Sequence, residues 1–184
     1  MPRTKVAAPL TLGVAAILLA GCAAGLDSAD SANTNVLTYL ESNWFNSLYP
    51  PAAGFYPNGG VVNQITDRLL YQDPETLELE PWIATELPEI NEDATVFTFN
   101  IRTDVTYSDG TPMTAQNIVD NFDLYGLGDK ERLLNVSEQI SNYERGEVVD
   151  EDTVRFYFSA PSPGFARATS TYNAGLLADS SLKL

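Results

Sequence analysis

The chain has 184 residues, of which 25 are acidic, 10 are basic, one is cysteine and none is histidine. Its net charge of −15 argues against nucleic acid as a partner, because phosphate binding requires a basic surface. The absence of histidine excludes a Ser-His-Asp hydrolase, a Cys-His protease and a His-ligated zinc site. A single cysteine excludes an intrachain disulfide and a CxxC motif. Asp and Glu remain for acid–base or hard-cation chemistry, but we expect no metal site and no cofactor.

The N-terminal residues are typical of a signal peptide. Arg3 and Lys5 precede an uncharged stretch at residues 6–20, which is too short to span a bilayer comfortably. The sequence LLAGC at residues 18–22 resembles the bacterial lipobox, in which a lipid is attached to the cysteine through a thioether before cleavage. The resemblance implies that Cys22 is the lipid-attachment site, and the alternative is a plain signal peptide with a chance cysteine.

Such processing divides the chain into three parts. We expect a lipoprotein signal peptide at residues 1–21, a lipidated cysteine and flexible tether at residues 22–35, and a folded domain at residues 36–184. The tether is small and polar, and as a flexible coil it reaches roughly 20 Å. Cleavage leaves eight basic against 25 acidic side chains, a net charge of −17, so the lipid alone must hold the protein at an anionic membrane.

Hydrophobic patterns predict the first elements of the folded domain. Residues 36–40 are rich in β-formers and favour a strand, and residues 47–60 form a long loop with three prolines. Apolar side chains at helical spacing predict a helix with one buried face over residues 60–70. An Asp-Pro pair at residues 73–74 then predicts a turn.

The second half of the domain alternates strands, turns and helices, which is typical of a mixed α/β fold. Phenylalanines that alternate with polar residues predict half-buried strands, and a threonine before an apolar periodic run predicts a helix N-cap. The first expected elements are a strand at 97–101, a short strand at Tyr107 and a turn at 109–110. A helix at 115–125 follows, capped by Thr114 and with Ile118, Val119 and Phe122 on one face. The remaining elements are a weaker helix at 130–142, a strand at 154–158, a turn at 161–164 and a helix from Phe165 toward Tyr172.

Within the loop at residues 47–60, called here the aromatic loop, residues 49–60 are the first candidate binding site. Gly54 lets backbone approach a ligand, and Phe55 and Tyr56 offer a large contact area at small entropic cost. The same aromatic side chains would also serve to hold a long loop onto the domain, and the sequence leaves both interpretations open.

Charged residues elsewhere indicate turns and a local ion pair. The acidic runs at residues 89–93 and 150–152 lack the ligand spacing of a calcium loop, and both precede predicted strands, so solvated hairpin turns are expected. Arg102 and Asp104 are spaced for a charge-assisted bond that fixes a strand end, with an anion clamp as the alternative.

Four blocks of the chain, in order, resemble the family 5 extracellular solute-binding proteins of ABC importers, the oligopeptide, dipeptide and nickel type. These blocks are LLYQDPETLELEPWI at residues 69–83, VFTFNIR at 96–102, YSDGTPMTAQNIV at 107–119 and VVDEDTVRFYF at 148–158. The most specific part of the resemblance is the strand followed by SDGTPMTA.

This resemblance implies a periplasmic-binding-protein-like type II fold of the mixed α/β class. Family members are several times longer and close two lobes around a ligand. We therefore expect residues 36–184 to be the N-terminal subdomain and the start of the first lobe only, an N-terminal fragment that binds peptides weakly or not at all by itself. The family also implies ligand contacts from the loop around Gly54, Phe55 and Tyr56.

The function implied by the resemblance is that of a lipid-anchored, extracytoplasmic substrate-binding component of an ABC importer. Its partners would be a peptide or similar small solute and the permease and ATPase subunits, and the chain itself would catalyse no reaction. The alternatives are a peptide-sensing or chaperone lipoprotein on the same fold, a secreted hydrolase that uses carboxylates such as Asp67 and Glu75, and a non-functional remnant.

Overall fold

The computed structural model describes residues 38, 40, 47–53, 58–130 and 140–182. Internal contacts divide the chain into two units, Met1–Leu40 and Glu41–Leu184. In the first unit, Thr38 and Leu40 have no regular secondary structure, so the strand expected over residues 36–40 is absent at these two positions, and its other residues lie outside the described range. All elements below belong to the second unit.

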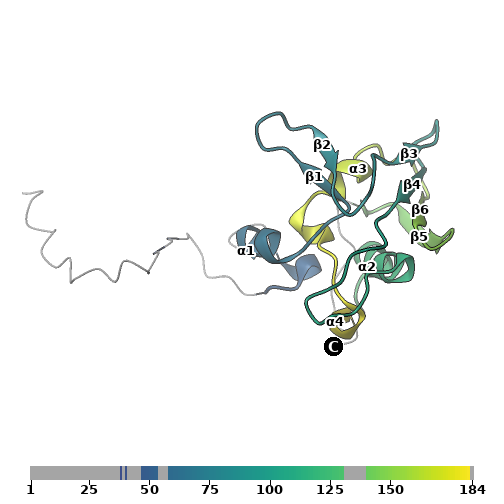
Figure 1. Ribbon diagram of the computed structural model, residues 1–184. Coiled ribbons are helices and arrows are strands. Elements are labelled where there is room, and N and C mark those ends of the chain that lie inside the picture. The colour runs from purple at the N-terminus through teal and green to yellow at the C-terminus, as the bar shows by residue number, and fades with distance from the viewer. Residues whose placement is uncertain (1–37, 39, 41–46, 54–57, 131–139, 183–184) are drawn as a thin grey trace, which may run out of the picture. The chain divides into compact units, whose positions relative to one another are not determined.

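A four-stranded antiparallel sheet forms one layer of this unit (Figure 1). Its order is β3 (Glu89–Ile90), β4 (Val96–Asn100), β6 (Thr153–Phe158) and β5 (Tyr143–Val148). The central strands pair in the register Phe97 to Phe156 and Phe99 to Val154, and their side chains alternate between buried and half-buried. The strands expected at 97–101 and 154–158 are therefore confirmed, because one face of each is apolar.

Helix α2 (Ala115–Leu127) packs on the inner face of the sheet against β5 and β6. Thr114 is its N-cap, with a side-chain oxygen that accepts a hydrogen bond from the Asn117 backbone N–H at 3.1 Å. The predicted apolar face is buried, with Ile118, Val119 and Phe122 no more than 4% exposed. Both the helix and its cap are confirmed.

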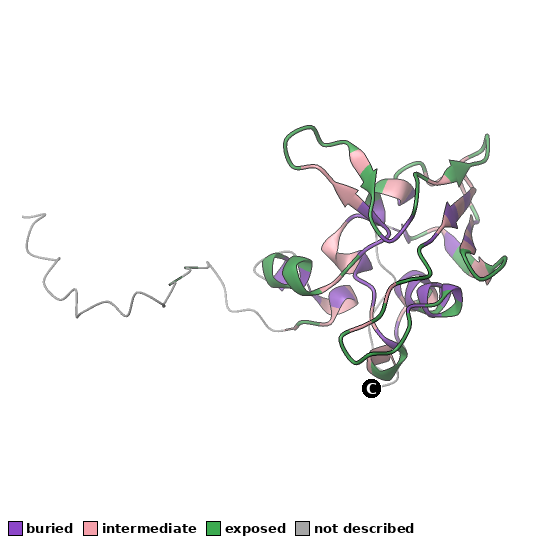
Figure 2. Ribbon diagram, in the orientation of Figure 1, coloured by how far each residue is buried: buried purple, intermediate pink, exposed green. Residues whose placement is uncertain are grey.

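The core between the sheet and the helices is aromatic. Phe122 of α2 lies 4.7 Å from Phe156 of β6, centroid to centroid. Phe165, in the short helix α3 (Phe165–Ala168), lies 4.6 Å from Phe158 and 5.0 Å from Phe97. In Figure 2, buried residues are marked on α2 and on strands of the sheet. Tilted and edge-on ring pairs of this kind add to the stability conferred by burial alone.

The close approach of α2 and β5 depends on two glycines. A Cβ atom on Gly126 of α2 would lie 2.2 Å from Cδ1 of Tyr143. A Cβ atom on Gly146 of β5 would lie 2.7 Å from Cγ1 of Val119. Both distances are shorter than atoms can tolerate, so the missing side chains are what let the helix reach the strand.

A second, two-stranded sheet consists of β1 (Leu70–Gln72) and β2 (Leu79–Pro81), whose connection is exposed (Figures 1 and 2). The Asp73 carboxylate accepts hydrogen bonds from the backbone N–H groups of Glu75 at 2.8 Å and Thr76 at 2.7 Å. These bonds lower the pKa of Asp73, and Leu77 completes the turn with a φ of 62°. The expected Asp73-Pro74 turn is confirmed.

The helix expected over residues 60–70 is wrong in its bounds and in its buried face. Helix α1 covers Asn58–Ile65 and ends where the Thr66 hydroxyl donates a hydrogen bond to the Val62 carbonyl at 2.8 Å. Val62 is buried, but Val61 and Ile65 are exposed. The two leucines that completed the apolar pattern, at 69–70, are fully buried beyond the helix, where Leu70 begins β1.

The helix expected from Phe165 is also shorter than predicted. After α3, the hydroxyls of Thr169, Ser170 and Thr171 bond to the carbonyls of residues 166–168, and such bonds compete with continuation of a helix. The chain then forms the 3₁₀ helix η3 (Tyr172–Ala174) and α4 (Asp179–Leu182). A further 3₁₀ helix, η1 (Pro50–Ala52), precedes α1, and most of the helix expected at 130–142 lies outside the described residues.

The acidic run at 150–152 and the Asp-Gly pair lie in turns, as expected, whereas the run at 89–93 lies only partly in a turn, because its first two residues pair with β4 as a strand. Residues 89–93 include β3 and the turn into β4, where the Asn91 side chain accepts backbone hydrogen bonds from Thr95 and Val96 at 2.8 Å each. Residues 150–152 connect β5 and β6. Gly110 has a φ of 85°, a backbone conformation that favours glycine at that turn. The short strand expected at Tyr107 is replaced by an isolated β-bridge at residue 106.

Two asparagines of α2 attach the segment before α4 to the domain. The Asn121 amide donates to the Leu177 carbonyl at 2.9 Å and accepts from the Leu177 N–H at 3.0 Å. The Asn117 amide nitrogen lies 3.0 Å from the same carbonyl and 2.7 Å from Oδ1 of Asp179. Because Asn121 is fully buried, this paired recognition of one residue's backbone fixes the path of the segment.

Candidate functional site

A groove of about 860 Å³ lies beside α1 and β1 and is called here the α1–β1 groove. It lies between the end of α1, the segment that follows it, the β1–β2 sheet and the turn before η3. Most of its lining side chains form hydrogen bonds. The residues that line the groove are Asn63, Gln64, Ile65, Thr66, Asp67, Arg68, Tyr71, Gln72, Pro74, Trp82, Ser170, Thr171 and Tyr172.

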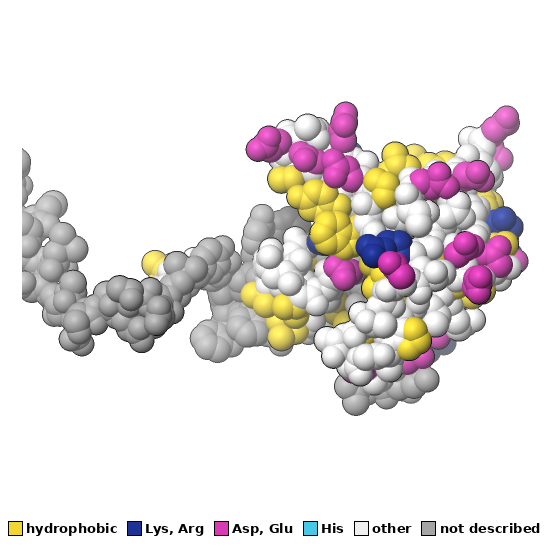
Figure 3. All heavy atoms as spheres, in the orientation of Figure 1, with side chains coloured by type: hydrophobic (Ala, Val, Ile, Leu, Met, Phe, Trp, Pro, Cys, Tyr) yellow, Lys and Arg dark blue, Asp and Glu magenta, His cyan; other side chains and the backbone are white. Residues whose placement is uncertain are grey.

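Two aromatic rings form the apolar wall of the α1–β1 groove. The ring centroids of Tyr71 and Trp82 are 5.6 Å apart with an interplanar angle of 33°, and Trp82 remains 46% exposed. The indole Nε1–H donates to Oδ1 of Asp67 at 2.8 Å, which fixes the orientation of the ring. Figure 3 shows apolar side chains gathered at the base of the β1–β2 sheet. An exposed, oriented indole is suited to contact the apolar part of a ligand.

Arg68 brings a buried positive charge to the α1–β1 groove. The residue is 9% exposed, and its guanidinium donates a hydrogen bond to the side-chain oxygen of Asn63. Its backbone carbonyl accepts the N–H of Ile83 at 3.2 Å, so the chain is held firmly at this point. Burial lowers the pKa of Arg68, and the adjacent Asp67 acts in the opposite direction.

The described residues of the aromatic loop, before and after residues 54–57, pack near the α1–β1 groove. On one side, the carbonyl of Pro50 accepts a hydrogen bond from the Asn173 side chain at 3.3 Å. On the other, a Cβ atom on Gly59 would lie 2.8 Å from the ring of Tyr172, which lines the groove. Both flanks therefore lie against η3, although the predicted contact residues Gly54, Phe55 and Tyr56 lie outside the described residues.

Cys22, the predicted lipid-attachment residue, also lies outside the described residues. Among the residues that the structure describes, no helix is long and apolar enough to cross a membrane. The same part of the chain contains no cluster of three or more Asp, Glu, Cys or His side chains arranged to hold a metal ion.

The two carboxylates weighed as an acid–base pair have separate surroundings. Asp67 is hydrogen-bonded to Trp82, whereas Glu75 lies in the exposed turn between β1 and β2, where its backbone N–H bonds to Asp73. Across the described residues, no hydrogen bond joins Asp67 to Glu75. The structure therefore provides no paired carboxylates here for acid–base chemistry.

The local ion pair predicted for Arg102 and Asp104 is confirmed. The Arg102 Nε atom lies 3.0 Å from Oδ1 of Asp104, and the Arg102 terminal nitrogen lies 3.2 Å from Oδ2. The hydrogen bonds and the opposite charge lower the pKa of Asp104 and raise that of Arg102. Because both side chains are exposed and paired with each other, this pair acts at the strand end rather than as an anion clamp.

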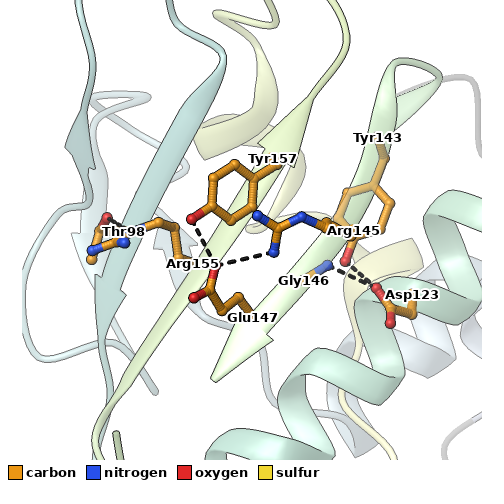
Figure 4. A network of polar contacts seen from close by, with 8 residues as sticks. All are labelled: Thr98, Asp123, Tyr143, Arg145, Gly146, Glu147, Arg155 and Tyr157. Atoms are coloured by element: carbon orange, nitrogen blue, oxygen red, sulfur yellow. Dashed lines mark hydrogen bonds and ion pairs between the residues drawn. The ribbon is translucent and has the colours of Figure 1, made fainter. Parts of the chain in front are cut away.

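The outer side of the sheet carries a polar network of its own (Figure 4). Glu147 accepts hydrogen bonds from the Tyr157 hydroxyl at 2.7 Å and from the Arg145 guanidinium at 3.0 Å. The guanidinium carbon of Arg145 also lies 3.7 Å from the centre of the Tyr157 ring. Arg155 is bonded to Thr98 on the neighbouring strand at 3.1 Å. These groups satisfy one another and link strands β4, β6 and β5.

The residues that define the α1–β1 groove were missed by the sequence interpretation. Arg68 and Tyr71 fall within or beside the run assigned to a helix, and Trp82 was noted only as part of a family-like block. An arginine directly before two leucines that are themselves buried was the available signal. Its burial depends on contacts between distant segments, which no local pattern encodes.

A protein-family model, described as "Bacterial extracellular solute-binding proteins, family 5 Middle", matches the sequence over residues 78–182, which is more than half of the chain. Among curated proteins, Protein XP55 of Streptomyces lividans is 38% identical over 68 residues, which cover 37% of this chain and 12% of that protein. The match therefore spans a small part of that relative.

Solved structures share the fold at lower sequence identity. MoaA of A. tumefaciens R10, solved with mannopinic acid, has a TM-score of 0.65 and 24% identity, over 76% of this chain and 28% of its own. DppA of Helicobacter pylori, an ABC transporter-associated periplasmic binding protein solved with the peptide STSA, has a TM-score of 0.63 and 19% identity, over 76% and 30% of the two chains. This chain thus spans less than a third of the length of either.

These similarities confirm the expected fold class, a mixed α/β periplasmic-binding-protein-like type II fold of which this chain covers a part. Members of the matched family bind solutes and are not enzymes. The match covers the second strand of the β1–β2 sheet, the four-stranded sheet and α2, which together form most of the core described above. The chain belongs to the bacterial extracellular solute-binding proteins of family 5.

Proposed function

We propose that this protein is the substrate-binding component of an ABC importer and that it binds peptides or similar small solutes for uptake by that importer. The observation that carries the proposal is the family match over residues 78–182, on the fold of proteins solved with peptides. Besides DppA, these include OppA of Listeria monocytogenes bound to peptide and a dipeptide-binding protein of Pseudoalteromonas sp. SM9913 with Met-Leu. The permease and ATPase subunits are the proposed partners, and the chain itself catalyses no reaction.

The α1–β1 groove supports a binding role on chemical grounds. It combines an apolar wall with amide, hydroxyl and charged side chains, and ligand sites commonly combine such groups. The flanks of the aromatic loop lie against the same 3₁₀ helix that lines the groove. Gly54, Phe55 and Tyr56, between these flanks in the sequence, are the proposed solute contacts.

Uptake by cells provides the test of the transport proposal. Deletion of the gene is expected to reduce uptake of a labelled tripeptide, and the intact gene supplied in trans is expected to restore it. Unchanged uptake, in a genome without neighbouring permease and ATPase genes, would contradict the proposal. If uptake is unchanged but a peptide-dependent transcriptional response is lost, the protein is a peptide-sensing lipoprotein instead.

The N-terminal part carries a separate proposal about location. We assign residues 1–21 to a lipoprotein signal peptide, Cys22 to the lipid-attachment site, residues 22–35 to a tether and residues 36–184 to the solute-binding domain. Several acyl chains on Cys22 would suffice to anchor an acidic protein outside the cytoplasm. Metabolic labelling with an alkyne fatty acid is expected to mark the wild type and not Cys22→Ser. Equal labelling of both would contradict the assignment.

A further inference from the structure

A second hollow, of about 370 Å³, lies where the start of α2 meets the end of β5, and we call it the α2–β5 pocket. It shares no lining residue with the α1–β1 groove. Its apolar lining consists of Pro112, Met113, Ala115 and Val148. Met113 and Ala115 are no more than 4% exposed, whereas Val148 is 38% exposed. The pocket therefore offers apolar surface to a side chain that enters from outside.

The charged side chains that line the α2–β5 pocket are acidic. Asp150 and Glu151 stand in the exposed turn between β5 and β6, and none of the described lining residues is a lysine or an arginine. Within the described part of the chain, neither carboxylate takes part in an ion pair. The arginine closest to the lining in sequence, Arg102, is paired with Asp104 at 3.0 Å. The negative charge at the pocket's edge is thus left without a cation.

An apolar hollow beside acidic side chains has the composition of a protein docking site. Protein interfaces combine an apolar centre, into which one partner inserts a side chain, with a charged and polar rim. The carboxylates of Asp150 and Glu151 attract lysine and arginine and repel acidic surfaces. A second copy of this chain, with a net charge of −15, and an anionic lipid surface are therefore both unsuitable occupants. A basic protein segment is the complementary one.

We propose that the α2–β5 pocket docks a protein segment in which an apolar side chain is flanked by lysine or arginine. The apolar side chain lies against Met113 and Val148, and the basic side chains meet Asp150 and Glu151. The inference rests on the proposed function, in which the permease subunit is the partner, and adds the docking surface and the chemistry of the segment. Opposite charges speed the encounter, and the apolar contact slows dissociation.

Two adjacent valines provide a matched test. Val148 lines the pocket, whereas Val149 is 42% exposed and lies outside the lining. Val148→Lys places a positive charge where the basic segment docks, so the initial rate of tripeptide uptake by cells is expected to fall about tenfold or more. Val149→Lys makes the same change of charge and is expected to support uptake at the wild-type rate. Neither position belongs to the α1–β1 groove, and both purified full chains are expected to melt at the same temperature.

Charge reversal beside the pocket decides the matter if Val148→Lys is less stable. Glu151→Lys is expected to slow uptake because it opposes the basic segment from the rim. Glu92→Lys, an equal change in the exposed turn before β4, is the control and is expected to leave uptake unchanged.

Photo-crosslinking in intact cells identifies the occupant. A p-benzoylphenylalanine in place of Gln116, an exposed residue of the pocket lining, is expected to capture the permease encoded beside this gene, as identified by mass spectrometry. The same photoreactive residue in place of Glu92 is expected to capture none. Val148→Lys is expected to reduce the capture at position 116.

The outcomes distinguish the docking proposal from the function on which it rests. Normal wild-type uptake together with equal uptake by Val148→Lys and Val149→Lys would overturn the docking proposal and leave transport standing. Capture of a second copy or of another part of this protein's own chain would place a different occupant in the pocket and also overturn it. Absence of wild-type uptake, with no permease captured, would overturn both proposals.

Discussion

At the residue scale, the indole of Trp82 connects the two sides of the α1–β1 groove. Its hydrogen bond to Asp67 joins the base of the β1–β2 sheet to the segment after α1. Trp82→Phe keeps an aromatic ring beside Tyr71 but removes the donor, so we expect a loss of about 1 kcal/mol in the free energy of unfolding, measured in urea. A double-mutant cycle with Asp67→Ala, which removes the acceptor, checks the cause, because additive effects of the two changes would show that the bond contributes nothing.

Two buried tyrosines, Tyr125 and Tyr143, and the half-buried Tyr107 make stability sensitive to high pH. Burial raises the pKa of Tyr107, Tyr125 and Tyr143, with the carboxylates of Asp179 and Asp123 adding to the effect at Tyr107 and Tyr143 respectively. The native state therefore keeps phenol protons that the unfolded chain releases near pH 10. Their stabilising contribution is complete below that pH and is lost as the pH rises above it.

Urea unfolding at pH 9 and at pH 11 measures this dependence. The free energy of unfolding is expected to fall between the two values, and Tyr143→Phe is expected to make the fall smaller because one such proton is removed. Tyr157→Phe, at a tyrosine on the outer side of the sheet, is the matched control. An equal decline in all three proteins would contradict the assignment to buried phenols.

At the element scale, α2 is both the cover of the sheet and the attachment of the C-terminal segment. Asn121→Ala removes its two hydrogen bonds to Leu177, so the Leu177 N–H loses its acceptor, while the Leu177 carbonyl keeps the Asn117 amide at 3.0 Å. We expect a loss of about 1–3 kcal/mol in the free energy of unfolding and faster hydrogen exchange at the Leu177 amide. The control is Asp120→Ala, on the exposed side of the same helix, which is expected to leave that amide protected.

At the scale of the whole molecule, stability depends on one aromatic core. Phe156 is fully buried and contacts the rings of Phe99, Phe122 and Phe165. Phe156→Ala is expected to cost about 3–5 kcal/mol, a large share of the 5–15 kcal/mol that stabilises a typical domain. Thermal unfolding followed by circular dichroism measures this loss. Phe156→Leu should cost clearly less, and similar values for both variants would mean that the core relaxes around the cavity.

The elements that sequence predicted well are those in which one local pattern determines the outcome. The strands around Phe97 and Phe156 alternate cleanly, and α2 has both a capping threonine and an apolar face. The helix at 60–70 failed because two separate apolar groups happened to share helical spacing. Val62 packs from the helix, whereas the leucines at 69–70 are buried on entering a strand.

The candidate site was less predictable than the fold for a physical reason. Arg68, Trp82 and Ser170 approach one groove from three segments, and only the packed domain brings them together. No periodic pattern in the sequence predicts that a charged residue will be buried, because charged side chains generally remain exposed to water. The predicted contacts Gly54, Phe55 and Tyr56 and the anchor Cys22 remain predictions, since they lie outside the described residues.

The position of Trp82 also has a practical consequence for studies of this protein. The chain contains two tryptophans, and one of them lines the α1–β1 groove with its ring half exposed and its N–H held by a carboxylate. A solute that covers this ring would remove water from it and change the local field, so the indole emission should shift to shorter wavelength. With Trp44 replaced by phenylalanine, the protein would contain a single tryptophan, whose emission reports occupancy of the groove without any attached dye.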